Sequence, residues 1–234
     1  VSAAAIAAAA CLAVVAAPDM LLRMQADVMT DTGEARVIAL SDGSMLNLAP
    51  RSAVAIDVTK EQRTVRLLRG TAYFDIARDP AHPFRVKTGD VVTTVLGTAF
   101  EVRREADGAA VAVRRGLVAV ACERDTTGVH LRIGDAVNAG CSHPIHRYKV
   151  QPSRIATWTQ GRIVASDRPL REVVDALRPW HKGLIIAQGT RLDSERVTGV
   201  YDARHPARAL RGLAAVHRLS VRTVTPWITI VQAD

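Results

Sequence analysis

One stretch decides the fold of this chain: Val65-Arg66-Leu67-Leu68-Arg69-Gly70-Thr71-Ala72-Tyr73-Phe74. It sets a glycine between two short runs rich in apolar and β-branched residues, which is the pattern of two strands joined by a turn. The pattern recurs from Thr32 to Val120, with strands of roughly five to seven residues and no helical period between them. For residues 31–142 we therefore predict a mainly β domain of stacked or solenoid-like antiparallel strands.

Few aromatic residues are available to fill this region, because they make up only 4% of the chain. Its three phenylalanines, Phe74, Phe84 and Phe100, all fall in the β region. We expect them to be buried together, since each ring supplies a large share of a small core. The glycines that we expect to be structural, at turns, are Gly43, Gly70 and Gly97.

The pattern changes at about residue 158, where helical spacing appears. Apolar residues at i, i+3, i+4 and i+7 are Leu170, Val173, Val174 and Leu177. They predict a helix that begins near Pro169, with a strand on either side. A second strand–helix–strand round follows, with its helix starting at Pro206. Residues 158–234 are thus predicted to form a small α/β domain containing a β-α-β unit twice.

The chain opens with an apolar run, residues 1–18, that contains no charged side chain. Eighteen helical residues span about 27 Å, close to the hydrocarbon thickness of a bilayer, so we predict a transmembrane helix here. Neither a methionine nor a basic segment precedes the run, and we expect the span to be truncated; a signal-peptide core cleaved near Ala17 is the alternative. Residues 19–30 are interpreted as a connector and residues 143–157 as a linker.

The formal net charge is +8 at pH 7, and residues 151–234 hold 13 Arg and Lys against 7 Asp and Glu. A basic excess can indicate nucleic acid, an anionic membrane or an acidic protein partner. The arginines are scattered among apolar residues without stacking aromatics, so we predict no nucleic-acid binding. No nucleophile-elbow, metalloprotease, P-loop or dinucleotide-binding motif occurs either, and we predict neither an enzyme nor a cofactor.

Two cysteines, Cys122 and Cys141, follow the last predicted strands of the β region. In an oxidising compartment they could form a disulfide. Alternatively, Cys141, His143 and His146 could join Cys122 in a zinc site, although structural zinc sites usually have closely paired ligands. The sequence leaves this choice open.

Several short motifs occur in order along the chain. They are Leu40-x-Asp42-Gly43-Ser44, Arg69-Gly70-x-Ala72-x-Phe74, Asp79-Pro80-x-x-Pro83-Phe84 and Leu96-Gly97-Thr98-Ala99-Phe100, then Trp158-x-x-Gly161-Arg162-Ile163 and Pro169-Leu170-x-Glu172. Taken together, these motifs resemble the FecR family of bacterial cell-surface signalling. The resemblance covers about Thr32 to the end. The C-terminal repeat is similar to the secretin and TonB short N-terminal domain.

The resemblance implies a single-pass inner-membrane regulator whose residues from about 19 onward lie in the periplasm. It implies that this part relays occupancy of an outer-membrane TonB-dependent transducer, of the iron–siderophore type, to an extracytoplasmic-function sigma factor. The sigma factor would be held by a cytoplasmic domain to which no residue of this sequence is assigned. A cell-envelope scaffolding protein that docks to a secretin-like complex is the alternative.

We expect the transducer's signalling domain to bind the C-terminal domain, because a small sheet leaves edge strands on which a partner strand can pair. The candidate strands are Val197 to Tyr201 and Ile228 to Val231. Surrounding arginines would steer an acidic partner. The candidate contact residues are Arg191, Arg196, Val197, Gly199, Tyr201, Arg222, Ile228 and Ile230.

Overall fold

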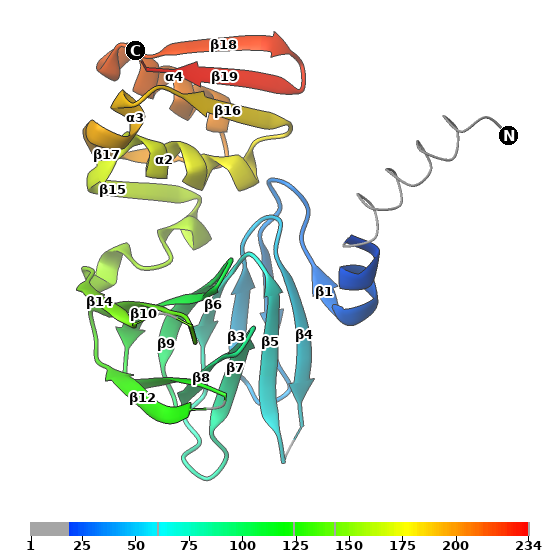
Figure 1. The fold of residues 1–234 in the computed structure, drawn as a ribbon. Helices are drawn as coiled ribbons and strands as arrows, with labels where there is room; N and C mark the ends of the chain where they lie inside the picture. Colours follow the sequence, from blue (N-terminus) through cyan, green and yellow to red (C-terminus); the bar gives the residue numbers. More distant parts are fainter. Residues whose placement is uncertain (1–18, 60, 124, 143, 234) are drawn as a thin grey trace, which may run out of the picture.

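The computed structural model of the 234-residue chain describes residues 19–59, 61–123, 125–142 and 144–233. The predicted transmembrane segment, residues 1–18, lies outside these ranges. Within them, no helix has the length and apolar character needed to cross a membrane. Figure 1 shows a β-rich part, followed along the chain by a smaller part of mixed helices and strands.

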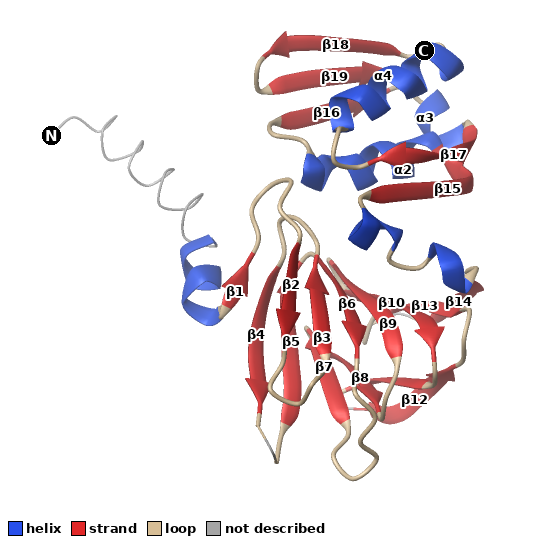
Figure 2. Ribbon diagram, turned by 180° about the vertical axis from the view of Figure 1, so that it is seen from behind, coloured by secondary structure: helices blue, strands red, loops and turns tan. Residues whose placement is uncertain are grey.

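The β-rich part consists of two seven-stranded sheets that share one hydrophobic core (Figures 1 and 2). The first sheet, in spatial order, contains β1 (Val28–Met29), β4 (Ala53–Val58), β5 (Arg63–Arg69), β7 (Phe84–Thr88), β8 (Val91–Val95), β11 (Val118–Cys122) and β12 (Asp125–Leu131). The second contains β14 (His146–Lys149), β13 (Asp135–Ala139), β10 (Gly108–Arg115), β9 (Ala99–Glu105), β6 (Thr71–Asp75), β3 (Met45–Leu48) and β2 (Arg36–Ala39).

The prediction of a mainly β region in stacked layers is confirmed, with one departure from antiparallel pairing. Strands β5 and β7 pair in parallel. Strand β6, which lies between them in the chain, crosses to the other sheet. The chain therefore returns beside β5 in the same direction, which an alternation pattern alone does not reveal.

The three phenylalanines meet in the core, as predicted. Phe74, Phe84 and Phe100 are fully buried. The rings of Phe74 and Phe100 stack with their centroids 5.1 Å apart, and the Phe84 ring lies tilted 6.2 Å from that of Phe74. Since Phe84 comes from one sheet and the other two from the second, the rings join the two layers.

The predicted turn glycines all have positive φ angles, and Gly70 shows why one of them is needed. Gly70 turns the chain from β5 into β6 with a φ of +82°. A Cβ atom at this position would lie 2.8 Å from the backbone of Ser52. A larger residue would thus be both strained and blocked. The other two are Gly43 and Gly97.

A buried arginine lies at the start of β5. The side chain of Arg63 is only 3% exposed, and its guanidinium lies 5.4 Å from the centroid of the Phe84 ring. It donates hydrogen bonds to a carboxylate oxygen of Asp42 over 2.7 Å and to the carbonyls of Ala77 and His82 over 3.0 Å each. Asp42, predicted only as a turn residue, thus balances a buried charge.

The surroundings of Asp42 favour its ionised form. Partial burial alone would raise the pKa of this carboxyl, but the backbone N–H of Ser44 and the guanidinium of Arg63 outweigh burial and lower it. The Ser44 hydroxyl donates to Asp42 and accepts from the backbone of Ala77, both over 3.0 Å. The Asp-Gly-Ser motif therefore forms a buried polar network as well as a turn.

Most of the predicted linker is ordered structure. Residues 146–149 form β14, which completes the second sheet by pairing with β13. Two 3-10 turns follow, η1 (Pro152–Arg154) and η2 (Thr157–Gln160). Ile155 and Ala156 between them are buried against Tyr73 and Ala99 of the β-rich part. We call residues 150–160 the strap, because they pack against the second sheet and do not form an unattached linker between two domains.

The C-terminal part contains a two-stranded sheet, a three-stranded sheet and helices. The first sheet pairs β15 (Arg162–Pro169) with β17 (Arg196–Asp202); the second has the order β16 (Leu184–Gln188), β19 (Ile228–Gln232), β18 (Ser220–Thr225). The helices are α2 (Leu170–Leu177), α3 (Arg191–Ser194) and α4 (Pro206–His217), with the 3-10 turn η3 (Arg178–Trp180) after α2. One core joins both sheets to α2 and α4.

The predicted succession of strands and helices is found, but it does not form two compact β-α-β units. Each helix connects strands that belong to different sheets: α2 joins β15 to β16, and α4 joins β17 to β18. Sequence periodicity gives the type of each element and not its pairing partner. Helix α2 begins next to Pro169, as predicted, and Pro169 occupies the N-cap position without a side-chain cap.

Candidate partner-binding site

The residues predicted to bind a partner are divided between the two C-terminal sheets. In β17 lie Arg196, Val197, Gly199 and Tyr201; in β19 lie Ile228 and Ile230; Arg222 belongs to β18 and Arg191 to α3. The structure therefore does not gather them at one sheet edge. Each set has to be judged in its own sheet.

Strand β17 has a free edge. It pairs with β15 along one side, and among the described residues no strand pairs with its other side. Val197 is buried in the core, while Val200 is 64% exposed. The backbone of β17 can therefore accept an added strand.

Strand β19 cannot serve as an edge, and the prediction for this strand is wrong. It is the central strand of its sheet, with β16 parallel on one side and β18 antiparallel on the other. Its backbone groups are thus already used in two ladders. The free edges of this sheet, within the described residues, belong to β16 and β18.

Local ion pairs occupy two of the three predicted steering arginines. Arg196 pairs with Asp167 at 3.2 Å, and Arg191 pairs with Glu195 at 2.7 Å. Neutralised charges of this kind contribute little to long-range attraction. Arg222 differs, because its side chain is exposed and the structure shows no ion pair between it and another described residue.

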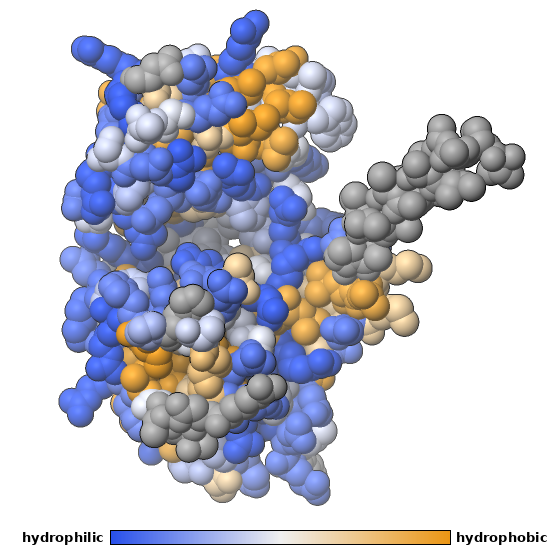
Figure 3. All heavy atoms as spheres, viewed as in Figure 1, coloured by the Kyte–Doolittle hydropathy of each residue, from blue (hydrophilic) through white to orange (hydrophobic). Residues whose placement is uncertain are grey.

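Hydrophobic surface gathers at the three-stranded sheet, which sequence patterns did not indicate. Figure 3 shows it as an orange area at the end of the C-terminal part where β16, β18 and β19 lie. Leu184 and Val224 are each 53% exposed and Trp227 is 69% exposed. Of these side chains, tryptophan is a typical anchor in protein interfaces, and a contiguous exposed apolar patch often marks an interaction site.

A hydrogen bond ties the strap to the β-rich part. The indole Nε1 of Trp158 donates to a carboxylate oxygen of Glu101 in β9, over 2.5 Å. A second hydrogen bond joins the β-rich part directly to the C-terminal part, because the backbone N–H of Gly33 donates to the carbonyl of Pro179 over 3.0 Å. The C-terminal part is thus attached to the β-rich part at two places that are far apart in the sequence.

The position of Glu101 makes its contribution to the stability of the fold depend on pH. Burial raises its pKa, and the indole of Trp158 and the charges of Arg103 and Arg168 only partly offset the effect. A raised pKa means that the folded chain holds the proton more tightly than the unfolded chain. The stability that this group contributes is therefore complete below its unfolded value of about 4.5 and is lost as pH rises through the folded value.

Replacing Glu101 with glutamine should remove this loss. We expect Glu101→Gln to become more stable relative to the parent as pH rises from about 4.5 to 8, which means that the difference between their free energies of unfolding increases. The reason is that the glutamine amide oxygen still accepts the hydrogen bond from Trp158 but carries no charge. Denaturant unfolding across this pH range measures the difference. Glu61→Gln, in the exposed loop after β4, is the control and should leave the pH profile unchanged. A Glu101→Gln profile parallel to that of the parent would contradict the assignment.

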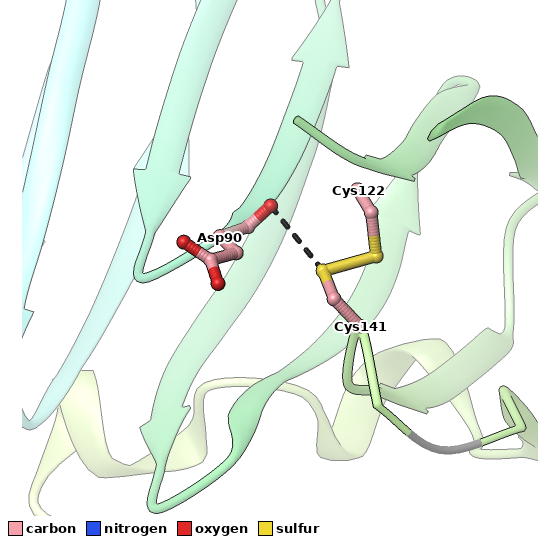
Figure 4. The surroundings of a disulfide bond; sticks show 3 residues. All are labelled: Asp90, Cys122 and Cys141. Atoms are coloured by element: carbon pink, nitrogen blue, oxygen red, sulfur yellow. Dashed lines mark hydrogen bonds between the residues drawn. A yellow bond between two sulfur atoms is a disulfide. The ribbon is translucent and has the colours of Figure 1, made fainter. Parts of the chain in front are cut away.

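A disulfide joins Cys122 at the end of β11 to Cys141 after β13, with Cα atoms 5.6 Å apart. It links the first sheet to the second, and the Cys141 sulfur lies 3.4 Å from the carbonyl oxygen of Asp90 (Figure 4). The pair borders an open groove of about 600 Å³ that also includes Arg104 and Asp107. Of the two alternatives left by the sequence, the structure contains the disulfide.

We expect the disulfide to contribute about 3 kcal/mol to stability by restricting the unfolded chain. Because Cys122 and Cys141 are bonded to each other, thiol titration of the unfolded, unreduced chain should find one free thiol per molecule, that of Cys11. Three titratable thiols would contradict the pairing. Reduction should lower the denaturation midpoint of the parent, and a Cys122→Ser/Cys141→Ser variant, which starts at the lower midpoint, should not respond.

No group of three potential metal ligands occurs among the described residues. His143, part of the zinc alternative, lies outside them. Cys122 and Cys141 are bonded to each other, so neither sulfur is a free thiolate ligand.

The fold is shared with two crystal structures, at 2.50 Å and 1.65 Å resolution, of a proposed anti-sigma factor from Parabacteroides distasonis ATCC 8503. The TM-scores are 0.75 and 0.76, and the sequence identity is 21% in both cases. Each alignment covers 88% of this chain, and 98% or 99% of the other. Among curated proteins, none matches the sequence.

A family model gives the narrower assignment. Residues 26–119 match the model of the FecR protein family. This segment runs from the start of the first sheet into β11 and includes the phenylalanine cluster and the Asp42–Arg63 pair. The β-rich part of this chain therefore contains a segment that is similar to the FecR protein family.

Proposed function

We propose that this chain is the signal-receiving part of a membrane-anchored anti-sigma regulator. The observation that carries the proposal is a FecR-like β-rich part joined through a packed strap to an α/β domain that has free strand edges and exposed apolar side chains. The proteins that share the fold are themselves described as proposed anti-sigma factors. Such a protein acts by contact with other proteins and needs no catalytic residues.

The proposal places the described part in the periplasm. A disulfide supports an oxidising compartment, because such bonds are rare in the bacterial cytoplasm. The uncharged run of residues 1–18 would supply the single span of the inner membrane. The signal would be occupancy of an outer-membrane TonB-dependent transducer, of the iron–siderophore type, and its target an extracytoplasmic-function sigma factor.

The proposed partner in the periplasm is the signalling domain of that transducer, bound through the C-terminal domain. Of the two strands predicted as docking edges, β17 keeps an unpaired side on which a partner strand could pair. The strap and the Gly33–Pro179 hydrogen bond would then pass the bound state on to the β-rich part.

Titration of the full-length chain with the purified signalling domain of the transducer encoded beside its gene tests the proposal. We expect saturable binding with one signalling domain per chain. Absence of binding would refute the proposal, and so would a neighbourhood that contains neither a sigma-factor gene nor a transducer gene. A neighbourhood of secretin and envelope-assembly genes would favour the scaffolding alternative.

A further inference from the structure

The three-stranded sheet of the C-terminal domain has one face in the core and one face outside. Ile185 and Val231 point inward and are almost fully buried, as is Thr229. Because side chains alternate along a strand, the residues next to them point outward. These are Leu184, Ile186, Ile228 and Ile230, and with Val224 and Trp227 at the β18–β19 turn they form what we call the outer patch.

The turn that carries Trp227 is firmly held. Its carbonyl accepts a hydrogen bond from the backbone N–H of Leu184 over 2.7 Å. Gly183 lies so close that a Cβ atom there would be 2.6 Å from the same carbonyl. The exposed indole is thus presented from a fixed backbone, which lowers the entropy lost when a partner binds it.

Among the described residues, the charged side chains on and next to the strands of the outer patch are basic. None of the residues of β16, β18 and β19 is acidic, and Arg222 stands opposite Ile230 on the outward face. Lys182 is exposed two residues before Leu184. In contrast, two arginines near β17, Arg191 and Arg196, are paired with carboxylates of their own domain. The outer patch therefore combines exposed apolar area with positive charge that has no acidic neighbour in its own strands.

We propose that the outer patch is the docking site for a protein surface with an apolar centre and flanking Asp or Glu residues. The proposal rests on the proposed function and deepens it, since it places the main contact on this sheet face and not on the β17 edge. A second copy of the chain fits less well, because its own Arg222 and Lys182 would meet like charges. Trp227 is the expected anchor, and the free edge of β18 lies beside it.

The test is titration of full-length variants with the same signalling domain. Trp227→Ala and Leu184→Ser should each weaken binding, the first by roughly 30-fold, as expected for a central tryptophan. Arg222→Glu should slow association, most clearly at low salt. The matched controls are Val216→Ser and Arg211→Glu on α4. These positions are both exposed, so the substitutions should preserve the fold and bind like the parent.

Each outcome decides between the claims. If the parent binds and the three patch variants bind equally well, the outer patch is wrong while the proposed function stands. If the parent does not bind, the proposed function fails and the docking site falls with it. Two other results would assign the patch to another occupant and overturn the proposal: a dimer in sedimentation that Trp227→Ala dissociates, or a Trp227-dependent fluorescence shift with phosphatidylglycerol vesicles.

Discussion

Replacing Arg63 with methionine is expected to lower the free energy of unfolding of the β-rich part by about 3–5 kcal/mol. The substitution keeps much of the side-chain volume but leaves the carboxylate of Asp42 without its cation, and the carbonyls of Ala77 and His82 without their donor. Buried polar groups that lose their partners carry the full cost of desolvation. The loss should exceed that of any surface ion pair in the chain, since exposed pairs contribute about 0–1 kcal/mol.

Urea denaturation followed by circular dichroism measures this effect. Arg66→Met, on the exposed side of the same strand, is the matched control and should change stability by about 0.5 kcal/mol or less. The double variant Asp42→Asn/Arg63→Met should lose less than the sum of the two single variants, because each removes the same contact. Additive losses, or an Arg63→Met variant as stable as the control, would show that the buried pair contributes nothing specific.

Truncating Phe100 to alanine is expected to cost about 3–5 kcal/mol as well. The ring is fully buried and stacks on Phe74, which itself contacts Phe84 of the opposite sheet. Removing it leaves a cavity between the two layers that a β-sandwich cannot readily close.

Thermal and urea unfolding of Phe100→Ala should reveal the loss, and Phe100→Leu should recover part of it. Leu117→Ala, in the turn before β11 where the side chain is 51% exposed, is the control and should stay within about 0.5 kcal/mol of the parent. If Phe100→Ala unfolded like the control, the three phenylalanines would not be the centre of this core.

Local patterns in the sequence were sufficient for the elements of the fold. Alternating apolar residues predicted the strands, and the spacing of Leu170 to Leu177 predicted α2, because both patterns follow from which face of an element is buried. The sequence did not reveal pairings between distant strands, such as the parallel pair β5–β7 and the separate sheets of β15 and β16. These pairings depend on how the sheets stack, and the spacing of apolar residues within one element contains no information on that.

The same limit explains the errors at the candidate site. An edge strand and a central strand have similar apolar alternation, so nothing in the stretch Ile228 to Val231 distinguished β19 from an edge. The pairing of Arg196 with Asp167 joins residues 29 positions apart, and the contact of Arg63 with Asp42 joins residues 21 apart. A signal for the outer patch was nevertheless present: the β18 and β19 sequences contain no acidic residue and flank an exposed tryptophan at a Thr-Pro-Trp turn.

The central claim is the proposal that the described part receives the signal of a sigma-factor regulator, and transcription in cells tests it most directly. The measurement is activity of a promoter that depends on the neighbouring extracytoplasmic-function sigma factor, with and without the transducer's ligand, in strains carrying the intact gene, the deleted gene or Trp227→Ala. We predict that ligand changes promoter activity severalfold only with the intact chain, and that Trp227→Ala uncouples the response while the protein still accumulates. An identical ligand response in the deletion strain would contradict the account.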